Sequence, residues 1–191
     1  MTKRTHLQDL LRQYSANDRR EELYKSRMED LLRESKTPFS REHFSPGHFT
    51  ASAFVLSPDQ SSLLMIFHSK LHRWLQPGGH IESSDTDVIA AAMRELLEET
   101  GVAGGTVVGD GLFDLDIHTI PARKGDPDHS HFDLRILLVS DSLEIAADTD
   151  AVDAKWVPLE DVSTIESDES VMRAVGKILN TRADPSNDLS L

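Results

Sequence analysis

The first 45 residues have the apolar periodicity of helices. In residues 4–14 and 17–34 the apolar positions recur at the spacing of one helical face, and the second segment is largely charged. In the second segment this face consists of Leu23, Tyr24, Met28, Leu31 and Leu32. Ser15 and Asp18 are typical residues for a helix start. We therefore expect a helical extension over residues 1–45, which either packs on the main domain or serves as the arm of a homodimer.

After residue 46 the pattern changes to short alternating segments, which predict strands around one amphipathic helix. The expected strands lie at 48–56, 63–68, 107–120, 129–139 and 153–157. A helix that ends near residue 101 divides them, and further helical segments are expected at 160–165 and 170–181. Strands on both sides of a central helix predict an α/β sandwich with a mixed sheet. This domain is expected to span residues 46–182, followed by a flexible tail at 183–191.

The central helix combines an apolar stripe with three glutamates on another face. The stripe consists of Ile89, Met93, Leu96 and Leu97. Three glutamates have the offsets i, i+3 and i+4, which bring their side chains together on the helix surface; this glutamate triad is Glu95, Glu98 and Glu99. Ser84 followed by Asp87 resembles a capping box, and Gly101 is typical of a left-handed helix end.

The glutamate triad predicts a site for a divalent cation. Like charges at this spacing repel one another, and a bound cation removes the repulsion. Carboxylate oxygens are the ligands that Mg²⁺ and Mn²⁺ prefer, and their remaining positions go to water and to substrate phosphates. Pro77-Gly78-Gly79 predicts a loop whose backbone approaches a ligand closely. The alternative interpretation of the triad is a solvated charged face.

The stretch from Gly79 to Val102 resembles the signature of the Nudix hydrolases. That signature is a Gly, five residues, a Glu, seven residues, Arg-Glu, an apolar residue, any residue, Glu-Glu, any residue, Gly and an apolar residue. Its second half is matched at every fixed position from Arg94 onwards. In the first half Asp85 replaces the Glu, and eight residues separate it from the Arg. We interpret this difference as a one-residue insertion in the loop.

The resemblance implies a Nudix-like α/β/α sandwich and hydrolysis of a diphosphate linked to another moiety, such as a nucleoside diphosphate derivative. It implies that the triad holds Mg²⁺ or Mn²⁺, together with the Gly79 carbonyl, and that a metal-bound water attacks phosphorus. Glu98 and Glu99 are the nearest acceptors of the proton from that water, and a Glu or His outside the signature is the alternative. In the family the loop acid braces the Arg, which is Arg94 here, and we expect Asp85 or Asp87 to take the role of that acid. Pairing of Arg94 with Glu98 is also open.

Nine histidines stand in the chain, and several share strand faces with acids. Alternation in the 129–139 strand places polar side chains on one face, namely His129, His131, Asp133 and Arg135. The other face, with Phe132, Leu134, Ile136 and Leu138, is expected to be core. In the segment before it, Asp114, Asp116 and His118 also share a face. Two such strands are expected to wall one cleft.

A weaker resemblance, to isopentenyl-diphosphate isomerases of the same fold, also concerns histidines. The strand that begins at His48 and the Gly79-His80 pair resemble metal-site segments of those enzymes, and their paired acids stand where this chain has His129 and His131. The resemblance implies a second metal or phosphate site made of His48, His80, His129 and His131. Hydrogen-bonded surface histidines are the alternative. Isomerase activity itself is not expected, because those enzymes need a catalytic Cys and this chain has none.

The net charge and the composition limit the classes of binding partner that the chain can have. The net charge is −13, without a basic stripe or tail, which argues against nucleic acid and anionic membranes. There is no Cys, no apolar run of signal-peptide type and no span long enough to cross a bilayer. We therefore expect a cytoplasmic enzyme of bacterial type that acts on a small-molecule diphosphate. Its substrate-binding candidates are Glu82, Asp85, Arg73, Arg135 and His118, with Lys70, Arg123 and Lys124 as further cations.

The main alternative from another class is a catalytically silent ligand-binding or regulatory module with the same fold. The intact triad argues against it. The identity of the diphosphate is left open, because specificity lies in loops such as 121–128 and in the N-terminal helices.

Overall fold

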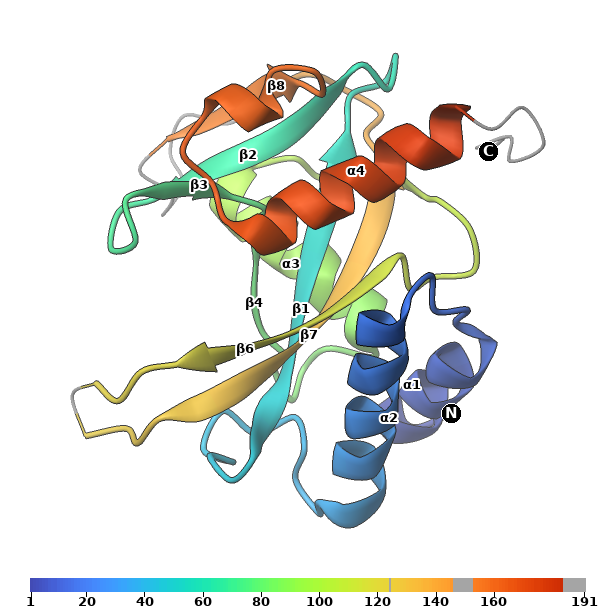
Figure 1. Cartoon of the computed structure of the whole chain (residues 1–191), viewed down its shortest axis with the longest axis vertical. Helices are drawn as coiled ribbons and strands as arrows, with labels where there is room; N and C mark the ends of the chain where they lie inside the picture. The colour runs from blue at the N-terminus through green and yellow to red at the C-terminus, as the bar shows by residue number, and fades with distance from the viewer. Residues whose placement is uncertain (124, 146–152, 184–191) are drawn as a thin grey trace. The chain divides into compact units, whose positions relative to one another are not determined.

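A computed structural model describes residues 1–123, 125–145 and 153–183, and it confirms an α/β fold with N-terminal helices (Figure 1). The helices are α1 (Lys3–Gln13), α2 (Arg19–Glu34), α3 (Val88–Thr100) and α4 (Glu169–Ala183), with a 3₁₀ turn at Val162–Thr164. The strands are β1 (Gly47–Leu56), β2 (Ser62–His68), β3 (Arg73–Leu75), β4 (Gly78–His80), β5 (Thr106–Val107), β6 (Asp114–Ile120), β7 (His129–Val139) and β8 (Ala154–Pro158). The tail predicted at 183–191 falls, but for its first residue, outside the described residues.

The described chain forms two compact units. The first unit consists of Met1–Ser52, Gly78–Ala92 and Asp110–Ile136, and the second of Ala53–Pro77, Met93–Gly109 and Leu137–Leu191. Strands β1 and β7 and helix α3 contribute residues to both units. Neighbouring strands follow the order β3-β2-β1-β7-β5, with β4 on β1, β6 on β7 and β8 on β2. The domain boundaries expected from the sequence stay a prediction.

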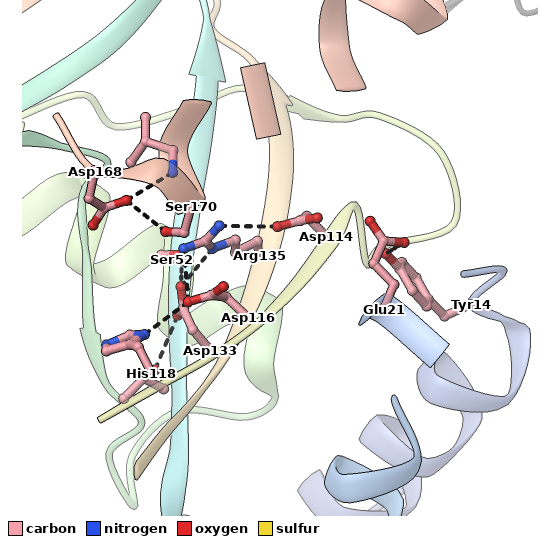
Figure 2. A network of polar contacts seen from close by, with 12 residues as sticks. Tyr14, Glu21, Ser52, Asp114, Asp116, His118, Asp133, Arg135, Asp168 and Ser170 are labelled. Carbon is pink, nitrogen blue, oxygen red and sulfur yellow. Dashed lines mark hydrogen bonds and ion pairs between the residues drawn. The ribbon is translucent and has the colours of Figure 1, made fainter. Parts of the chain in front are cut away.

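Helices α1 and α2 pack in the first unit through side chains that are almost fully buried: Leu7, Leu10, Leu11, Met28, Leu31 and Leu32. The predicted stripe on α2 was wrong at Leu23, which is 57% exposed. Glu21 is buried instead. Its carboxylate accepts hydrogen bonds from the Tyr14 hydroxyl at 2.8 Å and the Asn17 N–H at 2.9 Å (Figure 2). Two hydrogen-bond donors satisfy the buried carboxylate, so Glu21 can lie inside the helix pair.

The pairing of β6 with β7 places their polar faces together. The two strands are antiparallel, and the register sets Asp116 opposite Asp133 and His118 opposite His131. The bounds predicted for the 129–139 strand are confirmed, and its even-numbered residues from Phe132 to Leu138 are buried as predicted. The other face is buried too from Asp133 onwards, so burial itself does not alternate. The odd-numbered residues from His129 to Arg135 present one polar face, which becomes apolar at Leu137 and Val139.

Strand β4 corrects the loop predicted at Pro77-Gly78-Gly79. Residues Gly78–His80 pair with β1, with Gly78 opposite Ser52 and His80 opposite Thr50. A Cβ atom at Gly78 would lie 2.4 Å from the Ser52 Cβ atom. The glycine is therefore needed for close approach of two strands, and this pairing fixes the position of His80.

The second unit is built on β2, which pairs with β3 on one side and β8 on the other. The continuous strand expected at 107–120 was wrong. The chain between β5 and β6 instead turns through Gly109 and Gly111, whose φ angles are +73° and +118°. These left-handed conformations interrupt a strand, and Gly adopts them at low cost. The expected strand at 153–157 and helix at 170–181 are confirmed to within two residues at each end.

Helix α3 begins and ends at capping residues. Asp87 Oδ1 accepts hydrogen bonds from the backbone N–H groups of Ile89 at 3.0 Å and Ala90 at 2.9 Å, so Asp87 is the N-cap and the capping box predicted at Ser84 was wrong. Gly101 has φ +71° and donates its N–H to the Leu97 carbonyl, as predicted. The predicted apolar stripe was wrong at Leu97, which is 49% exposed. The buried side consists of Val88, Ala91, Ala92 and Leu96.

We expect Asp87→Ala to destabilise the protein by about 1 kcal/mol, because two N–H groups lose their acceptor. Asp87→Ser should retain most of the stability, since its hydroxyl can accept the same bonds. Urea denaturation midpoints of the two variants measure the difference. Equal midpoints for Asp87→Ala and the wild type would show that this cap contributes nothing.

Candidate active site

The glutamate triad lies on the last two turns of α3, within the second unit. The Glu95 side chain is 14% exposed and the Glu98 side chain 56% exposed. The Arg94 guanidinium lies between them, with Nη1 at 2.9 Å from Glu95 and 3.1 Å from Glu98. Glu99 is half-buried. The pairing with Glu98 is one of the two predicted for Arg94, and it balances part of the triad's charge in the folded chain.

The triad fits Mg²⁺ or Mn²⁺ in its donor chemistry. Its ligands are carboxylate oxygens, and Glu98 is accessible to solvent. The group of His, Asp or Glu residues in the described part of the chain whose ligand atoms all lie within 4.8 Å of one another is His48, His80 and His131. The glutamate triad does not meet that criterion, so its carboxylates are not preassembled around a cation. Mg²⁺ bound through one or two carboxylates keeps several waters and takes substrate phosphates as ligands. An open carboxylate face suits that mode.

The loop before α3 is organised by Asp85. Its side chain is buried, and Oδ2 accepts a hydrogen bond from the Glu82 N–H at 2.7 Å. The Lys3 ammonium donates to the Glu82 carbonyl, so α1 also holds this loop. The Glu82 side chain itself is exposed, as is Arg73 on β3. Asp85 therefore shapes the loop, which no consideration of spacing alone would have shown.

The predicted histidine site is brought together in the first unit. We call His48, His80 and His131 the histidine cluster; they come from β1, β4 and β7. Their ring centroids are 5.1 Å (48–80), 4.9 Å (48–131) and 5.2 Å (80–131) apart. His129 lies beside the cluster, at 5.1 Å from His48 and 5.3 Å from His131. The structure therefore places three of the four predicted histidines in one cluster, and whether they bind a ligand stays a prediction.

Burial keeps the cluster neutral. It lowers the pKa of His48 to about 4 and that of His131 to about 2, with neighbouring imidazoles adding to the effect, and it also lowers the pKa of His80. The opposite holds for His118, whose Nδ1 lies 3.0 Å from Asp116 Oδ2. Burial favours neutral His118, but the hydrogen bond to Asp116 and the charges of Asp133 and Asp116 outweigh it and raise the pKa.

Acidification below pH 6.5 is expected to destabilise the fold through His48. Unfolded imidazole titrates near 6.5 and folded His48 near 4, so between these values the unfolded chain binds more protons. The contribution is present above pH 6.5 and is lost as the pH falls towards 4, at about 1.4 kcal/mol per pH unit for one group. His118 has the opposite sign, because its raised pKa favours folding at low pH.

Urea denaturation of the wild type and of His48→Phe in EDTA, at pH 7 and pH 5, measures this effect. The variant should lose less stability than the wild type between the two values, because it has one neutral buried imidazole fewer. An equal loss in both proteins would contradict the assignment of the pH effect to His48.

Arg135 forms a buried ionic network further along the strand face that carries His131. Arg135, which was predicted as a substrate-binding candidate, is 1% exposed and engaged with carboxylates of the chain itself. Its Nε lies 3.0 Å from Asp133, Nη1 3.1 Å from Asp114 and Nη2 3.5 Å from Asp116 (Figure 2). The Thr50 and Ser52 hydroxyls also donate to Asp133, at 3.1 and 2.9 Å. Sequence alternation placed the acids on these faces, but the count of three buried carboxylates around one guanidinium was missed.

The sequence and the fold together show the family. A profile of the NUDIX domain matches residues 46–175, well over half of the 191 residues. The chain belongs to the NUDIX family. The matched region contains the signature segment Gly79–Val102, the histidine cluster and the Arg135 network. No curated protein sequence shows significant similarity to this NUDIX chain.

Solved NUDIX structures share the fold. A NUDIX-family hydrolase from Clostridium perfringens is 26% identical, over 69% of this chain and 97% of that one, with a TM-score of 0.52. A C. elegans Ap4A hydrolase in a binary complex is 19% identical, over 71% and 97%, at 0.53. The NUDIX domain of Shewanella oneidensis NrtR, complexed with ADP ribose, is 20% identical, over 82% and 98%, at 0.52. Family membership and the Clostridium hydrolase support the class of pyrophosphohydrolase.

Among the described residues, no helix combines the length and apolar character needed to cross a bilayer.

Proposed function

We propose that this NUDIX protein hydrolyses a phosphoanhydride bond in a small diphosphate, such as a nucleoside diphosphate linked to another moiety. The observation that carries the proposal is the complete second half of the family signature, from Arg94 to Val102, which lies on the end of helix α3 and the two residues after it, inside the matched region. The Ap4A hydrolase, and the NrtR domain complexed with ADP ribose, give substrate classes to test first. A cytoplasmic location and a homodimer through the N-terminal helices stay predictions.

The triad would hold the metal, and the Gly79 carbonyl, which the resemblance implies as a further ligand, stays a prediction. Bound Mg²⁺ or Mn²⁺ would neutralise the diphosphate and lower the pKa of a coordinated water. The protein contributes metal-binding carboxylates held on helix α3. Glu98 has the most exposed side chain of the triad, and it is our candidate for accepting the proton of the attacking water. Glu99, next to it in the chain, is the second candidate. Arg94 acts as a positioning residue, because it contacts both Glu95 and Glu98.

A second candidate function is a ligand-binding module without turnover. The NrtR domain supports it, since that structure holds ADP ribose on the same fold. The two functions differ in product formation. The test is a panel of dinucleoside polyphosphates, nucleoside diphosphate sugars and nucleoside triphosphates with Mg²⁺ or Mn²⁺, each with an EDTA control. Release of phosphate-bearing products that stops in EDTA supports hydrolysis, whereas binding of a panel member without any product supports the module.

A further inference from the structure

Three separate strands converge on one point in the first unit, and each delivers an imidazole there. His80 on β4 is opposite Thr50 on β1, and His48 lies two residues before Thr50, on the same strand face. His131 on β7 completes the triangle. One nitrogen of each ring lies within 4.8 Å of one nitrogen of the others. Three aromatic rings packed only for apolar contact have no need to bring their nitrogens together.

The tautomer of His48 leaves a lone pair inside the cluster. Its Nδ1 lies 3.3 Å from the His43 carbonyl, which can only accept a hydrogen bond, so Nδ1 carries the proton. Its Nε2 is buried, in a residue that is 0% exposed, and has no hydrogen-bond partner. Buried polar atoms are nearly always satisfied, and one that is not points to a missing ligand. A backbone contact that fixes the ring is the usual second interaction of a metal-bound histidine.

The charge around the histidine cluster favours a cation over a phosphate. Neutral imidazoles offer lone pairs and little positive charge. The strand faces that continue from His131 and His118 carry three acids around Arg135, namely Asp133, Asp116 and Asp114. His118 pairs with Asp116, so the carboxylates outnumber the cationic side chains paired with them. The excess of negative charge attracts a cation and repels an anion. Imidazole nitrogens select borderline ions such as Zn²⁺, whereas Mg²⁺ prefers oxygen.

We propose that His48, His80 and His131 bind one Zn²⁺ ion, through side chains different from those of the glutamate triad. Three protein ligands leave one tetrahedral position. His129 is the candidate to fill it, because its ring lies beside two cluster members and its Nδ1 is 2.8 Å from the Pro127 carbonyl, which orients the ring in the same manner as His48. Zn–N bonds of about 2.0–2.1 Å require the rings to close inward from their separation here.

The test is equilibrium dialysis of the full chain against Zn²⁺ in the presence of excess Mg²⁺, with metal content measured per chain. We expect one Zn²⁺ per chain. His80→Ala, on a half-buried edge strand, and His131→Gln should each weaken binding by about tenfold or more. His72→Asn is the matched control. His72 is exposed, lies outside the cluster and has φ +53°, which Asn tolerates. It should bind as the wild type does.

Circular dichroism without metal checks that each variant is folded. If a cluster variant does not fold, histidine-selective NMR of the wild type decides, because Zn²⁺ should shift the ring signals of His48, His80 and His131 and leave that of His72 in place. No bound Zn²⁺, or unchanged affinity in both cluster variants, would overturn the proposal. The Glu98→Gln variant should still bind Zn²⁺ at the histidine cluster. Zinc binding and diphosphate hydrolysis are therefore separate readouts, and failure of the histidine site can be distinguished from failure of the proposed hydrolase function.

Discussion

Glu98→Gln is expected to lose most of the diphosphate hydrolysis and to stay folded. The amide has nearly the same shape as the carboxylate but no charge, so it binds a divalent cation poorly and cannot accept a proton. The Glu98 side chain is 56% exposed, and its partner Arg94 keeps its ion pair with Glu95 and can still donate to the amide oxygen. Removal of a general base alone costs about a hundredfold or more in turnover. Steady-state rates on the best substrate of the panel, with Mg²⁺ saturating, measure the loss.

The matched control is Glu29→Gln, an exposed glutamate on α2 that lies outside the family match. It makes the same chemical change and should leave both turnover and unfolding midpoint unchanged. Full activity in Glu98→Gln would refute its assignment to the metal site. A wild-type chain that binds a panel member without turning it over would favour the ligand-binding module.

Arg135→Met is expected to destabilise the fold severely. Arg135 is the cation for three buried carboxylates, on Asp114, Asp116 and Asp133, and burial is outweighed by those charges, which raise its pKa. Loss of one side of a buried ionic network costs about 3–5 kcal/mol, because the remaining charges stay desolvated. With typical stabilities of 5–15 kcal/mol, such a loss removes a large share of the total. Denaturant and thermal midpoints are the measurements.

Two variants show whether the effect belongs to the network. Arg12→Met removes an equally long cation from an ion pair with Asp9, but the Arg12 side chain is 70% exposed, so a change within about 0.5 kcal/mol is expected. Arg135→Lys keeps the charge and loses the planar fork that reaches three acids, and should fall between Arg135→Met and the wild type. A loss below about 1 kcal/mol in Arg135→Met would show that the buried carboxylates do not depend on it.

The local pattern of apolar residues was sufficient to predict strand β7. Strand β7 was predicted with its observed bounds because the even-numbered residues from Phe132 are apolar throughout. The stripe on α3 was only partly predicted, since small residues pack where long ones were expected: Ala91 and Ala92 are buried and Leu97 is exposed. Helical spacing identifies a face, but the space available against the neighbouring structure decides which of two adjacent stripes is buried.

The histidine cluster was predicted as a group, but its membership depends on pairing that no local pattern contains. His80 joins it because Gly78 lets β4 approach β1 at Ser52, in a segment that reads as a loop. Arg135 was misjudged for a related reason. An arginine on a polar strand face looks exposed until the register places Asp114 and Asp116 on the facing strand. Long-range register, not residue type, made both differences.

The alternation of β7 makes the protein unequally tolerant of length changes. Residues 121–128 join β6 to β7 outside the paired register, so an added residue there can be absorbed by the connection. A residue lost between His131 and Arg135 would turn one end of the strand over, carrying a histidine or an acid into the core and an apolar side chain out of it. We therefore expect β7 to accept substitutions but no insertions or deletions, whereas the connection at 121–128 should accept insertions.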